Sequence, residues 1–326
     1  MKKIILTVLL TASLGSRAQV PDIKPLTTPQ RIEYLSGKVQ KFDAEPLYEL
    51  DIQSLLSFRI IVNGVPVYSN FNAAGGVARL TINSFILKSG KQNIEIELYP
   101  GYDHNGIQKR NLENGEKFVL KVEKTGWEKD GSSETQQDIL EFRNNDVNID
   151  YSKLTHYKTN LSFDASVPYH IKGWEDGEDL SVLNQKDLEL KVADFYKNIV
   201  LALKQKDYDY LNTVFLNADS EWYQAEYFSK ATIAELQSAR GRKGKSVSAG
   251  ATDPGTYSRT VYPVENYIMK FYADNRAVRL EPKEGFNRGE SLLGYEDVDK
   301  NGVRRRTFID MLLYIPKGTK SLQIIR

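Results

Sequence analysis

Residues 58–68 read FRIIVNGVPVY, two runs of β-branched and aromatic residues on either side of Asn63-Gly64. Asn-Gly accepts the positive φ angles of the tight turns that join hairpin strands. Pro66 has no backbone N–H to donate to a neighbour, so the second strand should lie at the edge of its sheet. The stretch therefore predicts a β-hairpin with an edge strand.

Short alternating runs of the same kind extend over residues 20–165, where no helical period is evident. Residues 93–99, NIEIELY, place Ile94, Ile96 and Leu98 on one face of a strand. The same alternation recurs at Phe118, Leu120 and Val122, at Leu140 and Phe142, and at Leu161 and Phe163. Many short strands separated by turn residues predict an all-β antiparallel sandwich as an N-terminal domain over 20–165.

The periodicity changes beyond residue 180. Asn184 can cap a helix, and an apolar residue follows at every third or fourth position. This stripe consists of Leu188, Val192, Phe195, Ile199 and Leu203. A short helix is expected after Lys206-Asp207, a third from about Ser220 towards Ala239, and strands follow to the C-terminus. Helices packed on an antiparallel sheet predict a C-terminal α+β domain over 181–326.

Residues 166–180 separate these two predicted domains. They contain Pro168, Gly173 and Gly177, together with the acidic residues Glu175, Asp176, Glu178 and Asp179. We interpret them as a solvated linker whose acidic end leads into a helix N-terminus.

A family resemblance begins at Phe195-Tyr196 and runs to the segment KDYDYL at 206–211. It resembles the opening helix pair of nuclear-transport-factor-2-like domains, which have a cystatin-like α+β fold. Those domains begin with a long helix, an acidic corner and a short helix, and they finish on a curved antiparallel sheet. The resemblance covers about 186–326 and does not extend to 20–165, and the long loop at 240–255 departs from the compact pattern. Family members include enzymes and binding modules, so the resemblance implies a fold and not a function.

The N-terminus has the features of a secretory signal peptide over residues 1–18. Lys2 and Lys3 precede the largely apolar run 4–14, and small residues surround a cleavage site after Ala18. Eleven residues of helix span about 16 Å, too short for a bilayer core. The alternative is a buried N-terminal helix or strand. We expect a mature protein that begins at Gln19 and is exported to the periplasm or the extracellular space, without a transmembrane anchor.

Composition excludes several classes of site. The chain has 326 residues, 44 Lys+Arg against 43 Asp+Glu, and no cysteine. Disulfides, thiolate metal sites, cysteine nucleophiles and lipid-modified cysteines are therefore excluded. The balanced charge lacks the basic field that is typical of a nucleic-acid-binding protein.

Local motifs supply no cofactor or metal site. Residues 297–302, DVDKNG, match the first half of a calcium loop, but the twelfth position is Phe308 rather than an acidic residue. We interpret them as a tight turn between two strands. His104, His156 and His170 lack any metal-binding or catalytic spacing, and no nucleophile elbow or phosphate loop is present. The sequence predicts no bound cofactor and no metal.

Two groups of residues are candidates for binding. Trp222, Tyr223 and Tyr227 fall on the expected third helix, where aromatic residues usually form core but an exposed subset could anchor a partner. Arg240, Arg242 and Lys243 lie in a loop rich in glycine, serine and lysine and could form a polar rim.

These observations predict an exported, non-enzymatic binding protein whose partner is a protein or a polysaccharide and not a nucleic acid. One alternative is a carbohydrate-active hydrolase whose carboxylates converge only in the folded chain, and two carboxyls in an aromatic-walled cleft would favour it. Another is a structural component of the cell envelope.

Overall fold

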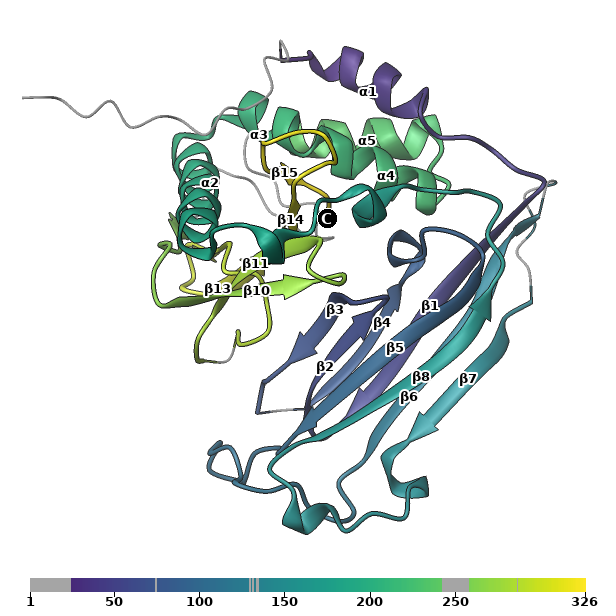
Figure 1. Cartoon of the computed structure of the whole chain (residues 1–326), viewed down its shortest axis with the longest axis vertical. Coiled ribbons are helices and arrows are strands. Elements are labelled where there is room, and N and C mark those ends of the chain that lie inside the picture. The colour runs from purple at the N-terminus through teal and green to yellow at the C-terminus, as the bar shows by residue number, and fades with distance from the viewer. Residues whose placement is uncertain are drawn as a thin grey trace, which may run out of the picture.

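The computed structural model describes residues 25–73, 75–128, 130, 132, 135–241, 258–285 and 287–326. The expected signal peptide at 1–18 lies outside these residues. The described chain is a mixed α+β structure with five α-helices and antiparallel strand pairing (Figure 1). None of the described helices has the length and apolar composition needed to cross a membrane.

The first half forms two four-stranded antiparallel sheets. In spatial order one sheet contains β4 (Gly76–Thr81), β1 (Ala44–Ser54), β6 (Phe118–Glu128) and β7 (Gln137–Arg143). The other contains β3 (Val65–Asn70), β2 (Ser57–Val62), β5 (Gly90–Tyr99) and β8 (Tyr157–Ala165). Alternate side chains of both sheets, such as Leu50, Ile60 and Ile96, are fully buried in one cluster. This shared core explains the alternation seen in the sequence.

The hairpin prediction is confirmed. β2 and β3 pair antiparallel across Asn63 and Gly64, whose φ angles are 50° and 77°. β3 lies at the edge of its sheet, as Pro66 requires. A Cβ on Gly64 would meet the Ala273 backbone at 3.2 Å, so glycine is needed here for close approach as well as for its φ angle.

A helix interrupts the expected all-β half. α1 (Thr28–Ser36) begins with a capping box between Thr27 and Gln30 and a proline in its first turn. It packs against α4 (Leu216–Ala225) and α5 (Lys230–Gly241), far away in sequence (Figure 1). Leu35 shares a small buried cluster with residues of these two helices. The expectation of strands alone over 20–165 was wrong because tertiary packing against α4 and α5 buries one face of this short segment.

The other helices follow the predicted pattern with one difference. α2 (Gln185–Gln205) is capped by Asn184 and buries Leu188, Val192, Phe195 and Ile199, and α3 (Tyr208–Val214) follows it. The expected third helix is two helices, α4 and α5. They are separated at a corner where Tyr227 adopts a positive φ of 53°, a conformation that a helix cannot continue through.

The C-terminal strands form two further sheets that pack against α2. One contains β10 (Tyr267–Tyr272), β11 (Ala277–Pro282), β14 (Leu313–Tyr314) and β15 (Gln323–Ile324). The other contains β13 (Arg304–Phe308), β12 (Gly294–Val298) and β9 (Ser258–Val261). Short 3₁₀ helices occur at η1 (Asn83–Phe85), η2 (Asn144–Asp146), η3 (Tyr151–Lys153), η4 (Gly173–Asp176) and η5 (Leu180–Val182).

Residues 166–180 are not the open linker that their glycines and acidic residues indicate. Val167, Tyr169, Ile171 and Trp174 are each at most 6% exposed and belong to the core of the first half. The Tyr169 hydroxyl also donates to the backbone carbonyl of Asn83 at 3.0 Å. The same core includes Tyr272, Ala277, Leu312 and Ile325 from the second half, so the two halves share one buried cluster.

Candidate functional site

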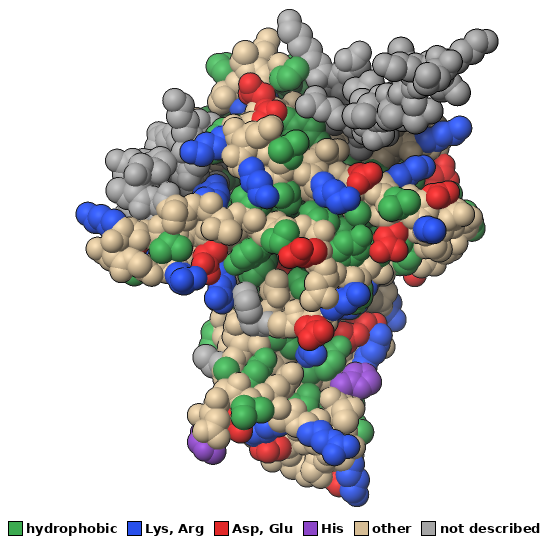
Figure 2. All heavy atoms as spheres, turned by 90° about the vertical axis from the view of Figure 1, so that its left-hand side faces the viewer, with side chains coloured by type: hydrophobic (Ala, Val, Ile, Leu, Met, Phe, Trp, Pro, Cys, Tyr) green, Lys and Arg blue, Asp and Glu red, His purple; other side chains and the backbone are tan. Residues whose placement is uncertain are grey.

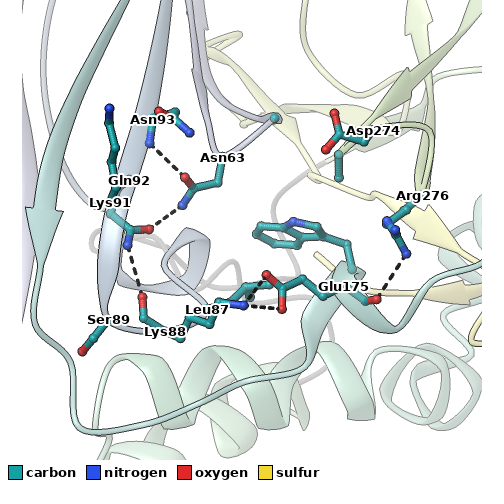
Figure 3. Close-up of a pocket in the computed structure, with 13 residues that line it drawn as sticks. Asn63, Leu87, Lys88, Ser89, Lys91, Gln92, Asn93, Glu175, Asp274 and Arg276 are labelled. Carbon is teal, nitrogen blue, oxygen red and sulfur yellow. Dashed lines mark hydrogen bonds and ion pairs between the residues drawn. The ribbon is translucent and has the colours of Figure 1, made fainter.

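A pocket of about 330 Å³ lies where the first half meets the β10–β11 turn, and we call it the junction pocket (Figure 3). Four segments far apart in sequence form its walls. They are the β2–β3 turn (Asn63, Gly64), residues 87–93 at the start of β5, Trp174 and Glu175 of η4, and residues Ala273, Asp274 and Arg276 of the β10–β11 turn.

Amide side chains fix one wall of the junction pocket. Asn63 Nδ2 donates to Gln92 Oε1 at 2.7 Å and to the Phe85 carbonyl at 2.8 Å, while Asn63 Oδ1 accepts from the Asn93 amide at 3.0 Å. Gln92 Nε2 in turn donates to the Lys88 carbonyl at 3.1 Å (Figure 3). Because these groups bond to each other and to the backbone, this wall is held rigid before any ligand arrives.

The opposite wall is a strained turn. Ala273, Asp274 and Asn275 have φ angles of 51°, 52° and 64°, a region that costs a non-glycine residue about 1–2 kcal/mol. Two tertiary hydrogen bonds hold the turn in place: Ala273 N donates to the Gly64 carbonyl at 2.8 Å, and Leu180 N donates to the Asn275 carbonyl at 2.8 Å. The turn presents Asp274 to solvent with no hydrogen bond or ion pair to any residue that the structure describes.

Charged side chains and one indole complete the pocket. Lys88 Nζ contacts both carboxylate oxygens of Glu175 at 2.9 Å, and Arg276 Nη1 donates to the Gly177 carbonyl at 3.1 Å. Trp174 is only 5% exposed, and the Arg326 guanidinium carbon lies 5.2 Å from its ring centroid. Exposed Lys91 and Asp274 lie on the pocket lining with opposite charges. The pocket thus suits a polar group that both accepts and donates hydrogen bonds.

The aromatic candidates do not form one exposed patch. Tyr223 is fully buried and Tyr227 is 3% exposed, so both are core residues and neither is exposed as a surface anchor would need to be. Trp222 is partly buried and contacts the Tyr223 and Phe228 rings at 5.2 and 5.5 Å. Helix α1 covers this cluster, which the sequence did not indicate because α1 was not expected.

The basic candidates fall at the boundary of the described residues. Arg240 lies on the backbone of α5 near its end, and its side chain is outside what the structure describes. Arg242 and Lys243 lie outside the described residues. The remainder of the loop up to 255 does so too.

The acidic motifs have structural roles. Asp299 Oδ1 accepts from the amides of Asn301 and Val303 at 2.8 and 2.9 Å, which confirms the tight turn, here between β12 and β13. Asp179 accepts from the Ser181 amide at 2.9 Å, and Glu178 from the Gly318 amide at 2.8 Å. Within the described part of the chain no group of three or more acidic or histidine side chains could hold a metal ion.

Sequence reasoning missed the junction pocket, although it quoted several of the residues that line it. Asn63-Gly64 indicates a turn, and the glycines and acidic residues around Trp174 and Glu175 indicate a linker. Their convergence depends on long-range packing, so no local spacing could have revealed it.

No protein-family model matches the chain, and neither the curated proteins nor the solved structures include a significant match. The resemblance of 186–326 to nuclear-transport-factor-2-like domains therefore stays a prediction.

Proposed function

We propose that the protein is exported and acts without catalysis, as a binding protein for a macromolecular partner that is a protein or a glycan. In this proposal the two four-stranded sheets form a sandwich domain and the C-terminal part forms an α+β domain. Basic and acidic side chains are interspersed over the face drawn in Figure 2, which fits a partner other than a nucleic acid.

The junction pocket carries the proposal. Its volume of about 330 Å³ is at the lower end of the range of ligand pockets, enough for one sugar unit or one polar side chain of a partner. Its amide wall is preorganised by the Asn63, Gln92 and Asn93 hydrogen bonds. The exposed charges of Lys91 and Asp274 provide a polar rim, as recognition sites normally have.

The carboxylates of this pocket favour binding over hydrolysis. A glycosidase needs two carboxyls that flank the bond to be cleaved. Lys88 contacts both oxygens of Glu175 at 2.9 Å, so this carboxyl is engaged in an ion pair rather than directed at a substrate. Asp274 is exposed to solvent on the turn, and no second carboxyl is paired with it among the described residues.

Binding is tested with the mature protein that begins at Gln19. The partner is captured from an envelope fraction of the host, identified by mass spectrometry, and then purified for titration calorimetry. We expect Lys91→Ala and Asp274→Ala each to weaken the affinity by about tenfold, which corresponds to a pocket contact worth more than 1 kcal/mol. Lys204→Ala, which makes the same charge change as Lys91→Ala on the exposed face of α2, should bind like the wild type.

Two results would count against the proposal. If both pocket variants bind like the wild type, the junction pocket is not the binding site. Turnover of a defined glycan or peptide by the purified protein would contradict the non-enzymatic role. Export is checked separately by the mass of the protein from its host, which should place the N-terminus at or near Gln19.

A further inference from the structure

A second cavity, of about 730 Å³, lies where the α4–α5 corner meets the start of β1 and the end of β6. We call it the corner groove. The residues that matter for its chemistry are Phe42, Glu45, Trp127, Glu226, Tyr227 and Phe228. It shares no lining residue with the junction pocket.

Aromatic rings form much of the wall of the corner groove. Trp127 is 48% exposed and lies opposite Glu45 in the β1–β6 ladder. Phe42 and Tyr227 meet edge to face with ring centroids 6.2 Å apart, and Phe228 follows directly in the chain. The faces of such rings carry negative potential and attract cations, most strongly for tryptophan.

The groove is lined by three carboxylates, those of Asp43, Glu45 and Glu226, together with the cation of Lys41. Lys41 Nζ contacts Glu45 Oε2 at 3.0 Å and also donates to the Tyr227 carbonyl. Arg79 divides its guanidinium between Glu49 and Glu123, at 2.7 Å each. Glu226 has neither an ion pair nor a side-chain hydrogen bond with any residue that the structure describes. Lys41 and Arg79 are therefore engaged by Glu45, Glu49 and Glu123, and Glu226 is left without a cation among the described residues.

Glu226 and the Tyr227 hydroxyl are the two polar groups of the groove that matter for a ligand. Burial, together with the charge of Glu49, raises the pKa of Glu226 to about 8. The Tyr227 hydroxyl is buried and has no hydrogen-bond partner in the described part of the chain. Burying a hydroxyl without a partner is costly, and such a group in a native structure calls for an explanation.

We propose that the corner groove binds an organic ammonium ion, whose alkyl groups contact Trp127, Phe42 and Phe228 and whose charge is neutralised by Glu226. A cation with apolar substituents fits both the aromatic rings and the carboxylate of the groove. The rings contact its alkyl groups, and the negative charge of the carboxylate attracts its positive centre. This site is independent of the proposed function of the junction pocket.

Binding of a cation is coupled to the release of a proton. The charged and titratable groups that face Glu226 are Lys41, Asp43, Glu45 and Glu49 around β1, Tyr169 from the segment after β8, and Tyr227. Of these, only Lys41 carries a positive charge, and it is already bound to Glu45. A bound ammonium ion therefore lowers the pKa of Glu226, and the affinity should rise with pH.

Choline and its uncharged carbon isostere, 3,3-dimethylbutan-1-ol, are the probes. The charge of choline does not change with pH, so any pH dependence comes from the protein. Binding is followed by calorimetry and by the fluorescence of Trp127, which lines the groove. With a pKa of about 8 the ionised fraction of Glu226 rises about 90-fold between pH 6 and pH 9, and the affinity for choline should follow it.

The matched variants are Glu226→Gln in the groove and Glu189→Gln on the exposed face of α2. We expect Glu226→Gln to bind choline no better than the isostere and without pH dependence, while Glu189→Gln behaves like the wild type. Trp127→Leu should weaken choline binding at pH 9 because it removes the ring face.

Three results would overturn the proposal: no choline binding at either pH, equal affinity for choline and the isostere, or a Glu226→Gln variant with the affinity and pH profile of the wild type. Failure of these tests leaves the junction pocket unaffected, since the two sites have different residues and different assays.

Discussion

Replacement of Glu281 by glutamine would test the charge cluster that joins the two halves of the chain. Glu281 lies on β11 and is fully buried. Its carboxylate contacts Arg59 of β2 at 2.6 Å, Arg279 at 2.6 Å and Lys270 at 3.0 Å. Arg279 also contacts Asp310 at 2.9 Å. Glutamine keeps the size of the side chain but leaves three cations with Asp310 as their one directly paired carboxylate among the described residues.

The expected cost follows from burial and from the charge balance. Removal of one partner from a buried ionic group typically costs about 3–5 kcal/mol, because the remaining charges lose their compensation. Arg59→Met should cost less, about 1–3 kcal/mol, since Glu281 keeps two cations and the cluster loses a surplus positive charge. Glu281→Gln should therefore be the more destabilising of the two changes, although Arg59 is the residue that bridges the halves.

The cluster also makes stability depend on pH. Burial alone would raise the pKa of Glu281, but Arg279, Arg59 and Lys270 outweigh burial and hold the pKa below its ordinary value. The stabilisation is therefore complete above the pKa of the unfolded chain and is lost as the pH falls through the lower folded value. The difference between the wild type and Glu281→Gln should shrink in acid.

The measurement is urea unfolding followed by circular dichroism at pH 7 and in acid, with Glu189→Gln as a control for charge removal at the surface. A Glu281→Gln cost below about 1 kcal/mol, the range of an exposed ion pair, would refute the reasoning. So would an Arg59→Met variant that is less stable than Glu281→Gln.

Three further predictions follow from buried groups elsewhere. Glu226→Gln should stabilise the protein by about 2–4 kcal/mol at pH 9 and have no such effect at pH 4. The pKa of Glu226 is raised from 4.5 to about 8, so the wild type loses stability as the pH rises through that window. Denaturant unfolding at both pH values checks this, and equal changes in stability at both would contradict it. Tyr223→Ala should lower the free energy of unfolding by about 3–5 kcal/mol, since the ring is fully buried and its hydroxyl accepts from Gln237. Trp222→Ala should lower it by less. The reverse order in thermal melts would place Trp222 in the core. Asn83→Ala should cost about 3 kcal/mol or more in stability. The fully buried side chain of Asn83 accepts from the Tyr48 backbone N–H and donates to the Pro46 and Ala225 carbonyls, so three groups would lose partners. A cost below that of a single exposed hydrogen bond in urea unfolding would contradict this.

The parts of the fold that could be predicted from the sequence are those encoded locally. The hairpin at 58–68 follows from Asn63-Gly64 and Pro66, and helix α2 follows from its cap and its apolar stripe. The sequence also contains local signals for α1 and for the burial of residues 166–171. Thr27 and Gln30 form a capping box ahead of α1, and the alternation of Phe163 and Ala165 continues through Val167, Tyr169 and Ile171 into the supposed linker.

The candidate sites could not be predicted in the same way. The junction pocket needs residues 63, 88, 174 and 274 at one place, and the corner groove needs residues 45, 127 and 226. No periodicity connects segments so far apart. The aromatic residues of α4 are evident in the sequence, but their burial depends on packing against α1 and on the corner at Tyr227, and neither is encoded within α4 itself.

The position of the junction pocket determines what a ligand there would do to the whole protein. Its amide wall belongs to the first half, while Asp274 and Arg276 belong to the second, and the shared core and the Glu281 cluster join the same two halves. Because the pocket exists only when the halves are docked, a ligand binds the folded chain and not the separated halves. Occupancy should therefore stabilise the protein against unfolding by about RT ln(1 + [L]/Kd), roughly 2.7 kcal/mol at a hundredfold excess over Kd. If the junction pocket binds a ligand as proposed, contacts of that ligand with Asp274 would offset part of the backbone cost of the turn at 273–275.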